Sequence, residues 1–172
     1  MSRQSARPCG GRRGAAITLG LLVLAGLTVG CGGQLDLKET LAVSDLSGGW
    51  YDAGIVNGKN KLLPSATFRL EKKSGEGVGP VALNVLFKRL VGGAEEEFED
   101  VYLQRVEFTE GDRTKPLVVR PEAGYTGEPP QTRAQMLENS QFVDVRAIIF
   151  VRQGSTWIEL ARLDLPRTLV TE

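Results

Sequence analysis

The sequence predicts an all-β protein whose folded part is a single antiparallel β-sandwich of about seven strands. Apolar and polar residues alternate along most of the chain after residue 40, which is the pattern of half-buried strands. Glycine and proline residues, which form turns, separate these alternating stretches. Only residues 132–138 have the amphipathic pattern of a short helix, so helices contribute little to the expected fold.

The expected strands follow one another along the chain with turn residues between them. Ala66, Phe68 and Leu70 alternate with polar residues, which predicts a strand with one buried face. The strand expected over residues 141–152 has the longest apolar face, so we place it at the centre of a sheet. In chain order, we expect strands over residues 41–46, 50–56, 66–71, 81–88, 98–108, 117–119, 141–152 and 157–165.

Turn signals and strand spacing together indicate the type of sandwich. Gly92-Gly93 predicts one turn, and Gly154-Ser155 predicts a two-residue hairpin turn of type II′, with glycine first. The spacing is typical of the immunoglobulin or fibronectin-III sandwich. Both cysteines, Cys9 and Cys31, precede the expected strands, so the disulfide of true immunoglobulin domains is absent and the fibronectin-III-like version is favoured.

The N-terminal segment has the three parts of a bacterial export signal. Four arginines precede a run of apolar or small residues over 15–30, and Cys31 follows directly. Val29 and Gly30 resemble the lipobox, at which a peptidase cuts before a cysteine that carries diacylglycerol. Thr28 departs from the leucine usual at its position. We therefore predict a lipoprotein signal over residues 1–30, with Cys31 as the lipidated residue.

Three other interpretations of this segment are less favoured. A permanent transmembrane helix needs roughly 20 apolar residues, and this run has 16. Twin-arginine export would use Arg12-Arg13, but the residues that follow do not match its motif. An ordinary signal peptide would leave a free Cys31 near the start of the mature chain, and this interpretation stays open.

Lipidation of Cys31 implies a location for the protein. Two or three acyl chains hold a protein stably on a membrane, whereas one holds it weakly. Gly32, and not aspartate, follows the cysteine, which resembles the pattern sorted to the outer membrane in many Gram-negative bacteria. We expect a membrane-anchored lipoprotein of the bacterial cell envelope, on the outer membrane and facing the periplasm. Residues 31–39 are then the lipidated start and a short tether, and residues 40–172 are the β-sandwich domain.

Composition limits the classes of function. The chain of 172 residues contains no histidine, which excludes Ser–His and Cys–His catalysis and removes the commonest transition-metal ligand. After residue 30 there are 17 basic and 21 acidic residues, so no nucleic acid is expected as a partner. The acidic run over residues 95–100 lacks the spacing of a calcium loop, and we interpret it as the solvated flank of a hairpin. We expect no cofactor and no metal site.

Two segments rich in aromatic residues are candidate surfaces for a partner or ligand. Gly124 and Gly127 flank Tyr125 within a connection of about 20 residues, and long connections are often functional. Trp50 and Tyr51 are adjacent, so in a strand they point to opposite faces and at most one enters the core. For both segments, packing in or against the core is the favoured alternative to recognition.

Three stretches of the chain carry a resemblance to known proteins. Residues 50–64, 124–127 and 139–144 are similar to a group of uncharacterised bacterial lipoproteins with an immunoglobulin/fibronectin-III-like β-sandwich domain. The resemblance implies a secreted, lipid-anchored sandwich. It implies no activity, ligand or catalytic residue.

These observations favour a non-enzymatic, lipid-anchored binding or interaction module that holds another envelope protein near the membrane. The first alternative is a structural or accessory subunit of an envelope complex for transport or assembly. The second alternative is a hydrolase that uses carboxylates alone.

Overall fold

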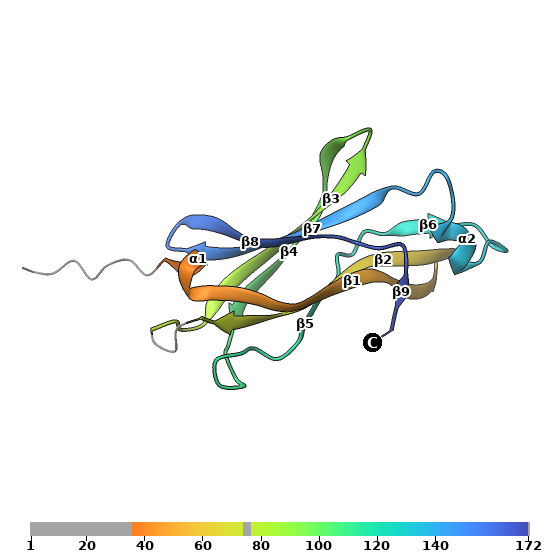
Figure 1. The fold of residues 1–172 in the computed structure, drawn as a ribbon. Coiled ribbons are helices and arrows are strands. Elements are labelled where there is room, and N and C mark those ends of the chain that lie inside the picture. Colours follow the sequence, from red (N-terminus) through yellow and green to blue (C-terminus); the bar gives the residue numbers. More distant parts are fainter. Residues whose placement is uncertain (1–35, 74–76, 172) are drawn as a thin grey trace, which may run out of the picture. The chain divides into compact units, whose positions relative to one another are not determined.

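The computed structural model describes residues 36–73 and 77–171, and Figure 1 shows their fold. Cys31 and the predicted signal lie outside these residues. Most of the described chain is β-strand, which confirms the all-β fold class. In chain order, the elements are α1 (Leu37–Thr40), β1 (Leu41–Val56), β2 (Lys59–Lys72), β3 (Val81–Val91), β4 (Ala94–Val106), β5 (Leu117–Val119), β6 (Tyr125–Gly127), α2 (Arg133–Leu137), β7 (Asp144–Gln153), β8 (Thr156–Asp164) and β9 (Leu169–Val170).

The described strands form two sheets (Figure 1). The first sheet has the order β5-β2-β1-β9, and β6 also pairs with β2. The second sheet has the order β4-β3-β7-β8. Pairing among the described strands is antiparallel except between β1 and β9, which is parallel. The antiparallel arrangement agrees with the turn signals in the sequence.

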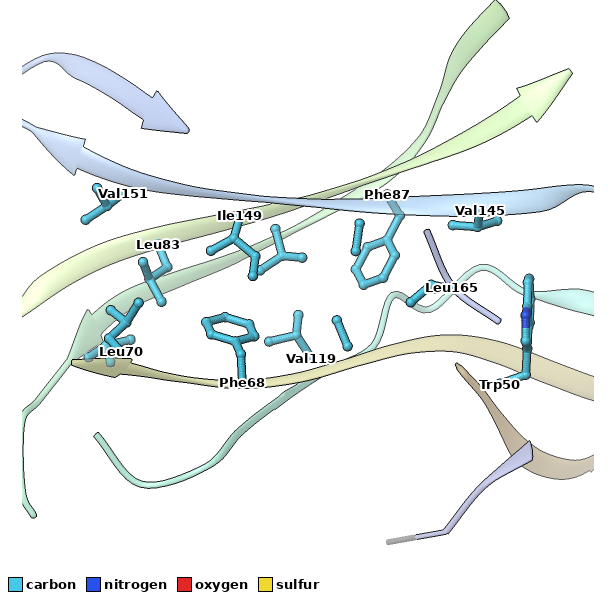
Figure 2. Packing of buried hydrophobic residues seen from close by; sticks show 14 of the residues in the cluster. Trp50, Phe68, Leu70, Leu83, Phe87, Val119, Val145, Ile149, Val151 and Leu165 are labelled. Carbon is cyan, nitrogen blue, oxygen red and sulfur yellow. The ribbon is translucent and has the colours of Figure 1, made fainter. Parts of the chain in front are cut away.

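Side chains from both sheets form one hydrophobic core. Phe68 of β2 points toward Phe87 of β3 and Ile149 of β7 (Figure 2). All three side chains are completely buried, and each contributes about 1.5–3 kcal/mol of stability by leaving water. The core therefore joins the two sheets through large apolar residues that the period-two pattern had placed on inward faces.

The alternation predicted for the central strand is confirmed. Val145, Ala147, Ile149 and Val151 are buried along β7, and the intervening positions lie on the opposite face. The strand begins at Asp144 and not at residue 141. Phe142 instead packs its ring against Trp50, with the ring centroids 4.5 Å apart.

The first strand of the structure differs from the prediction, which placed two strands over residues 41–46 and 50–56. The structure has one continuous strand, β1, so the predicted break is wrong. The pairing with β2 shifts between Ser44 and Ser47 and again between Asp52 and Ile55. Such irregularities insert extra residues and increase the twist without ending a strand.

The turns between neighbouring strands match their residue types. Asn57 and Gly58 join β1 to β2 with φ values of +53° and +78°, the combination that a type I′ hairpin turn requires. Gly154 has φ +59° between β7 and β8, as the predicted type II′ turn needs at its first position. Gly92 and Gly93, both with positive φ, join β3 to β4 as expected.

Two short helices complete the described fold. The Asp36 side chain accepts a hydrogen bond from the Lys38 backbone N–H at 2.9 Å and caps α1. Leu37 is buried in the core cluster, so the folded part extends into residues that were expected to be tether. The helix predicted over residues 132–138 is confirmed as α2, which begins with a capping box between Thr132 and Gln135.

Candidate functional site

Two of the three predicted aromatic candidates, Trp50 and Tyr125, pack against the same ring, that of Phe142. Trp50 is buried, and Figure 2 shows its ring at the edge of the core cluster. Tyr125 lies half-buried on β6, with its ring centroid 4.7 Å from that of Phe142, which also contacts Trp50. Edge-to-face pairs of this kind stabilise a fold by about 0.5–1.5 kcal/mol beyond their buried area. For Trp50 and Tyr125, these contacts agree with packing in or against the core, the alternative to recognition of a partner.

Tyr51 points to the other face of β1, as its position next to Trp50 requires. Its ring is half-buried, and the Arg120 guanidinium lies 3.8 Å from the ring centroid. Arg120 also has its Nε 3.2 Å from Ser65 Oγ on β2. The outer face of the first sheet is therefore covered at this point by an ordered cation–π contact.

The two glycines around Tyr125 allow close approach between chain segments. A Cβ at Gly124 would overlap the Leu62 carbonyl oxygen and lie 2.7 Å from Leu63 Cδ2. A Cβ at Gly127 would lie 2.8 Å from Met136 Cγ. Gly124 and Gly127 thus allow β6 to pair with β2 and α2 to pack behind β6. The long connection over residues 121–140 is held in place by these two packed elements.

This connection also braces the hairpin formed by β1 and β2. Arg133 donates from Nη1 to Asn60 Oδ1 at 2.7 Å and from Nε to the Asp52 carboxylate at 3.0 Å. Asn60 is buried, and its Nδ2 donates to the Gln131 carbonyl at 2.6 Å. The turn end of the hairpin, where Asn60 pairs with Ile55, is therefore fixed to residues 131–133 by hydrogen bonds through both the oxygen and the nitrogen of the Asn60 amide.

An apolar pair lies beside this brace, where β1 ends. Ile55 is 65% exposed and Val56 is 38% exposed, immediately before the Asn57-Gly58 turn. Successive residues of a strand point to opposite faces, so the pair presents apolar surface on both sides of the hairpin. We call Ile55 and Val56 the hairpin tip. The hairpin tip is therefore exposed apolar surface next to a hydrogen-bonded support.

Sequence reasoning missed the hairpin tip although a signal was present. Asn-Gly between two strand-like runs is the strongest short-range hairpin signal, and here it follows two aliphatic residues directly. The β3–β4 hairpin has a similar pair, Leu90-Val91, directly before its Gly92-Gly93 turn, and Val91 is 39% exposed. The β1–β2 hairpin has in addition the hydrogen bonds at Asn60 and the higher exposure of Ile55.

A second exposed cluster lies on the outer face of the second sheet. Tyr102 of β4 is 47% exposed and Trp157 of β8 is 38% exposed. Although β4 and β8 are the two edge strands, the rings meet edge to face with centroids 6.0 Å apart. The guanidinium of Arg152 on β7 lies 5.9 Å from the centre of the Trp157 ring. We call Tyr102 and Trp157 the aromatic bridge.

Further along the same face, charged residues form an ion-pair network. Arg146 donates to Asp164 at 2.9 Å and also pairs with Glu95, which accepts from Lys88 at 3.1 Å. Hydrogen bonds from Lys88 and Arg146 lower the pKa of Glu95, and the hydrogen bond from Arg146 lowers the pKa of Asp164. Both carboxyl groups stay ionised at neutral pH, which is the opposite of what a general acid needs.

Within residues 36–73 and 77–171, no three His, Cys, Asp or Glu side chains are grouped so as to hold a metal ion. In the same part of the chain, no helix is long and apolar enough to cross a membrane. The chain matches no protein-family model and no curated protein.

Proposed function

We propose that this chain is a non-enzymatic, lipid-anchored protein of the bacterial cell envelope that presents its hairpin tip to another envelope protein. The anchor is the lipid on Cys31, and Gly32 after it favours the outer membrane, with the domain facing the periplasm. The exposed Ile55 and Val56 on a braced hairpin are the observation that carries the interaction role.

The order of strands supports a fibronectin-III-like β-sandwich as the fold of this module. An immunoglobulin constant domain has four strands, ABED, on one sheet and three, CFG, on the other. Here the fourth long strand, β4, pairs with the third, β3, in the sheet that also holds β7 and β8. The sheet with β3, β7 and β8 thus corresponds to the sheet of C, F and G, and β4 belongs to it. The C′ strand of variable-type immunoglobulin domains belongs to that sheet as well.

Because β1 is long, the hairpin tip lies far from the start of the domain. Its first residue, Leu41, follows α1 directly, and Ile55 and Val56 end the strand (Figure 1). A strand of 16 residues spans about 50 Å at ~3.3 Å per residue. An anchor before residue 36 and a contact surface at residues 55–56 therefore occupy opposite ends of β1, which leaves the tip accessible to a partner.

Metabolic labelling with an alkyne-tagged palmitate tests the anchor. We expect the wild-type chain to incorporate the label and Cys31→Ala to lose it. Cys9→Ala is the matched control, since Cys9 lies within the predicted signal and should not affect labelling of the mature chain. An unlabelled wild-type chain, or equal labelling of the Cys31→Ala variant, would contradict the proposed anchor.

A further inference from the structure

The aromatic bridge lies at the end of the second sheet where the described chain begins. Trp157 is the second residue of β8 and pairs with Arg152, near the end of β7. Asp36 and Thr156 line one small hollow beside this turn. Leu37, Arg105 and Arg152 line a larger one next to it. The start of the domain, two arginines and the exposed tryptophan therefore share one end of the fold.

Covalent geometry limits how far this end can lie from a lipid on Cys31. Asp36 is five residues after Cys31. A chain spans at most about 3.3–3.6 Å per residue, so the two Cα atoms lie no more than ~18 Å apart. If Cys31 is anchored as proposed above, the α1 end of the domain is held within that distance of the bilayer surface.

The side chains at this end have the chemistry of a membrane interface. Tryptophan and tyrosine are enriched at the level of the lipid headgroups, because each combines an apolar ring with one polar group. Tyr102 and Trp157 are both exposed, so no rearrangement is needed to bring them to that level. Arginine donates bidentate hydrogen bonds to phosphate. Arg152 lies next to Trp157, and Arg105, whose Nε donates to Glu107 at 2.8 Å, lines the adjacent hollow together with Arg152.

We propose that the aromatic bridge, with Arg105 and Arg152, rests on the phospholipid headgroups of the membrane that holds the lipid of Cys31. This inference depends on the proposed anchor and adds an orientation to it. With the bridge on the membrane, the outer face of the second sheet is turned toward the bilayer at the α1 end of the domain, and the hairpin tip lies at the other end of β1. The lipid on Cys31 supplies attachment, and the bridge limits rotation of the domain about its tether.

The two tryptophans of the chain provide a direct test, since Trp50 is buried and Trp157 is exposed. Full-length lipidated protein is reconstituted into vesicles of phosphatidylethanolamine and phosphatidylglycerol, with or without bromine on the upper acyl chain. Bromine quenches tryptophan emission only at short range. We expect the emission of Trp50→Phe, which retains Trp157, to fall in brominated vesicles. Trp157→Phe is the matched control, and its emission should stay unchanged.

The possible results separate the orientation from the anchor. If Trp50→Phe floats with the vesicles and bromine leaves its emission unchanged, the orientation is wrong while the anchor stands. If the wild-type protein does not float with the vesicles, the anchor is wrong and this inference fails with it. A blue shift of the Trp157 emission that is equally large without vesicles would overturn the inference and indicate contact between two copies of the chain.

Discussion

Arg133 Nη1 lies 2.7 Å from Asn60 Oδ1 and so connects the start of α2 to the turn end of the β1–β2 hairpin, 73 residues earlier in the chain. Asn60 is buried and uses its other amide atom to donate to the Gln131 carbonyl. The pair converts a long connection into a support for the strand end that carries Ile55 and Val56. The rigidity of the proposed contact surface thus depends on residues outside the hairpin itself.

Removing this support should destabilise the protein measurably. In Arg133→Ala, the buried Asn60 Oδ1 loses its donor, and an unsatisfied buried acceptor costs about 1–3 kcal/mol. Urea unfolding followed by circular dichroism measures the change. Lys59→Ala is the control on the same hairpin, because its pair with Glu128 is exposed and worth less than ~1 kcal/mol. Equal losses for both variants would show that Arg133 acts only as a surface charge.

The close packing at Gly124 predicts a strong effect of a single methyl group. Gly124→Ala would push a Cβ into the Leu62 carbonyl oxygen, which belongs to the backbone of β2 and cannot move aside without disturbing the pairing with β6. We expect a loss of about 1–3 kcal/mol in the free energy of unfolding, the range for overpacked sites. Gly79→Ala is the control, since its Cβ would meet nothing within 4 Å. A loss of similar size at Gly79 would contradict the role given to Gly124.

The ion-pair network on the second sheet predicts the response to acid. The folded-state pKa values of Glu95 and Asp164 lie below their ordinary values of 4.5 and 3.8. Their contribution to stability is therefore complete above those values and is lost as the pH falls through the lower folded-state values. Arg146→Gln should be less stable than wild type at neutral pH, and the difference should shrink on acidification below about pH 4.5.

Urea unfolding at a series of pH values checks this prediction. Lys115→Gln serves as the control, because Lys115 is exposed on the segment between β4 and β5. We expect its stability to run parallel to that of wild type at every pH. A constant difference between wild type and Arg146→Gln from pH 7 to pH 2 would contradict the assigned ion pairs.

Several strands and turns of this fold were predictable from local sequence, but β6 and β9 were not, and β2 begins at Lys59, before the predicted strand over residues 66–71. Val145, Ala147, Ile149 and Val151 alternate with residues of the other face, and period-two alternation is a local property that survives folding. The turn at Gly154 was likewise predictable from local sequence. The continuity of β1 was not predictable, because the irregularities after Ser44 and Asp52 depend on pairing with β2.

The candidate surfaces were harder to predict because they depend on the order of the strands. Tyr102 and Trp157 are 55 residues apart and lie on strands that do not pair, yet their rings meet over the sheet. No spacing in the sequence encodes that contact. Tyr125 was a reasonable candidate by local signals, but its partner Phe142 and the pairing of β6 with β2 placed it against the core.

The measurement that tests the central claim most directly is photocrosslinking from position 55 of the membrane-anchored, full-length protein in cells, followed by mass spectrometry. A benzophenone amino acid replaces Ile55, and a second variant carries it at Val118, which is 51% exposed on β5 and so matches the tip in character. Our account predicts one dominant protein adduct from position 55 and none from position 118. No adduct from position 55, or the same adducts from both positions, would contradict the claim that the hairpin tip contacts a partner.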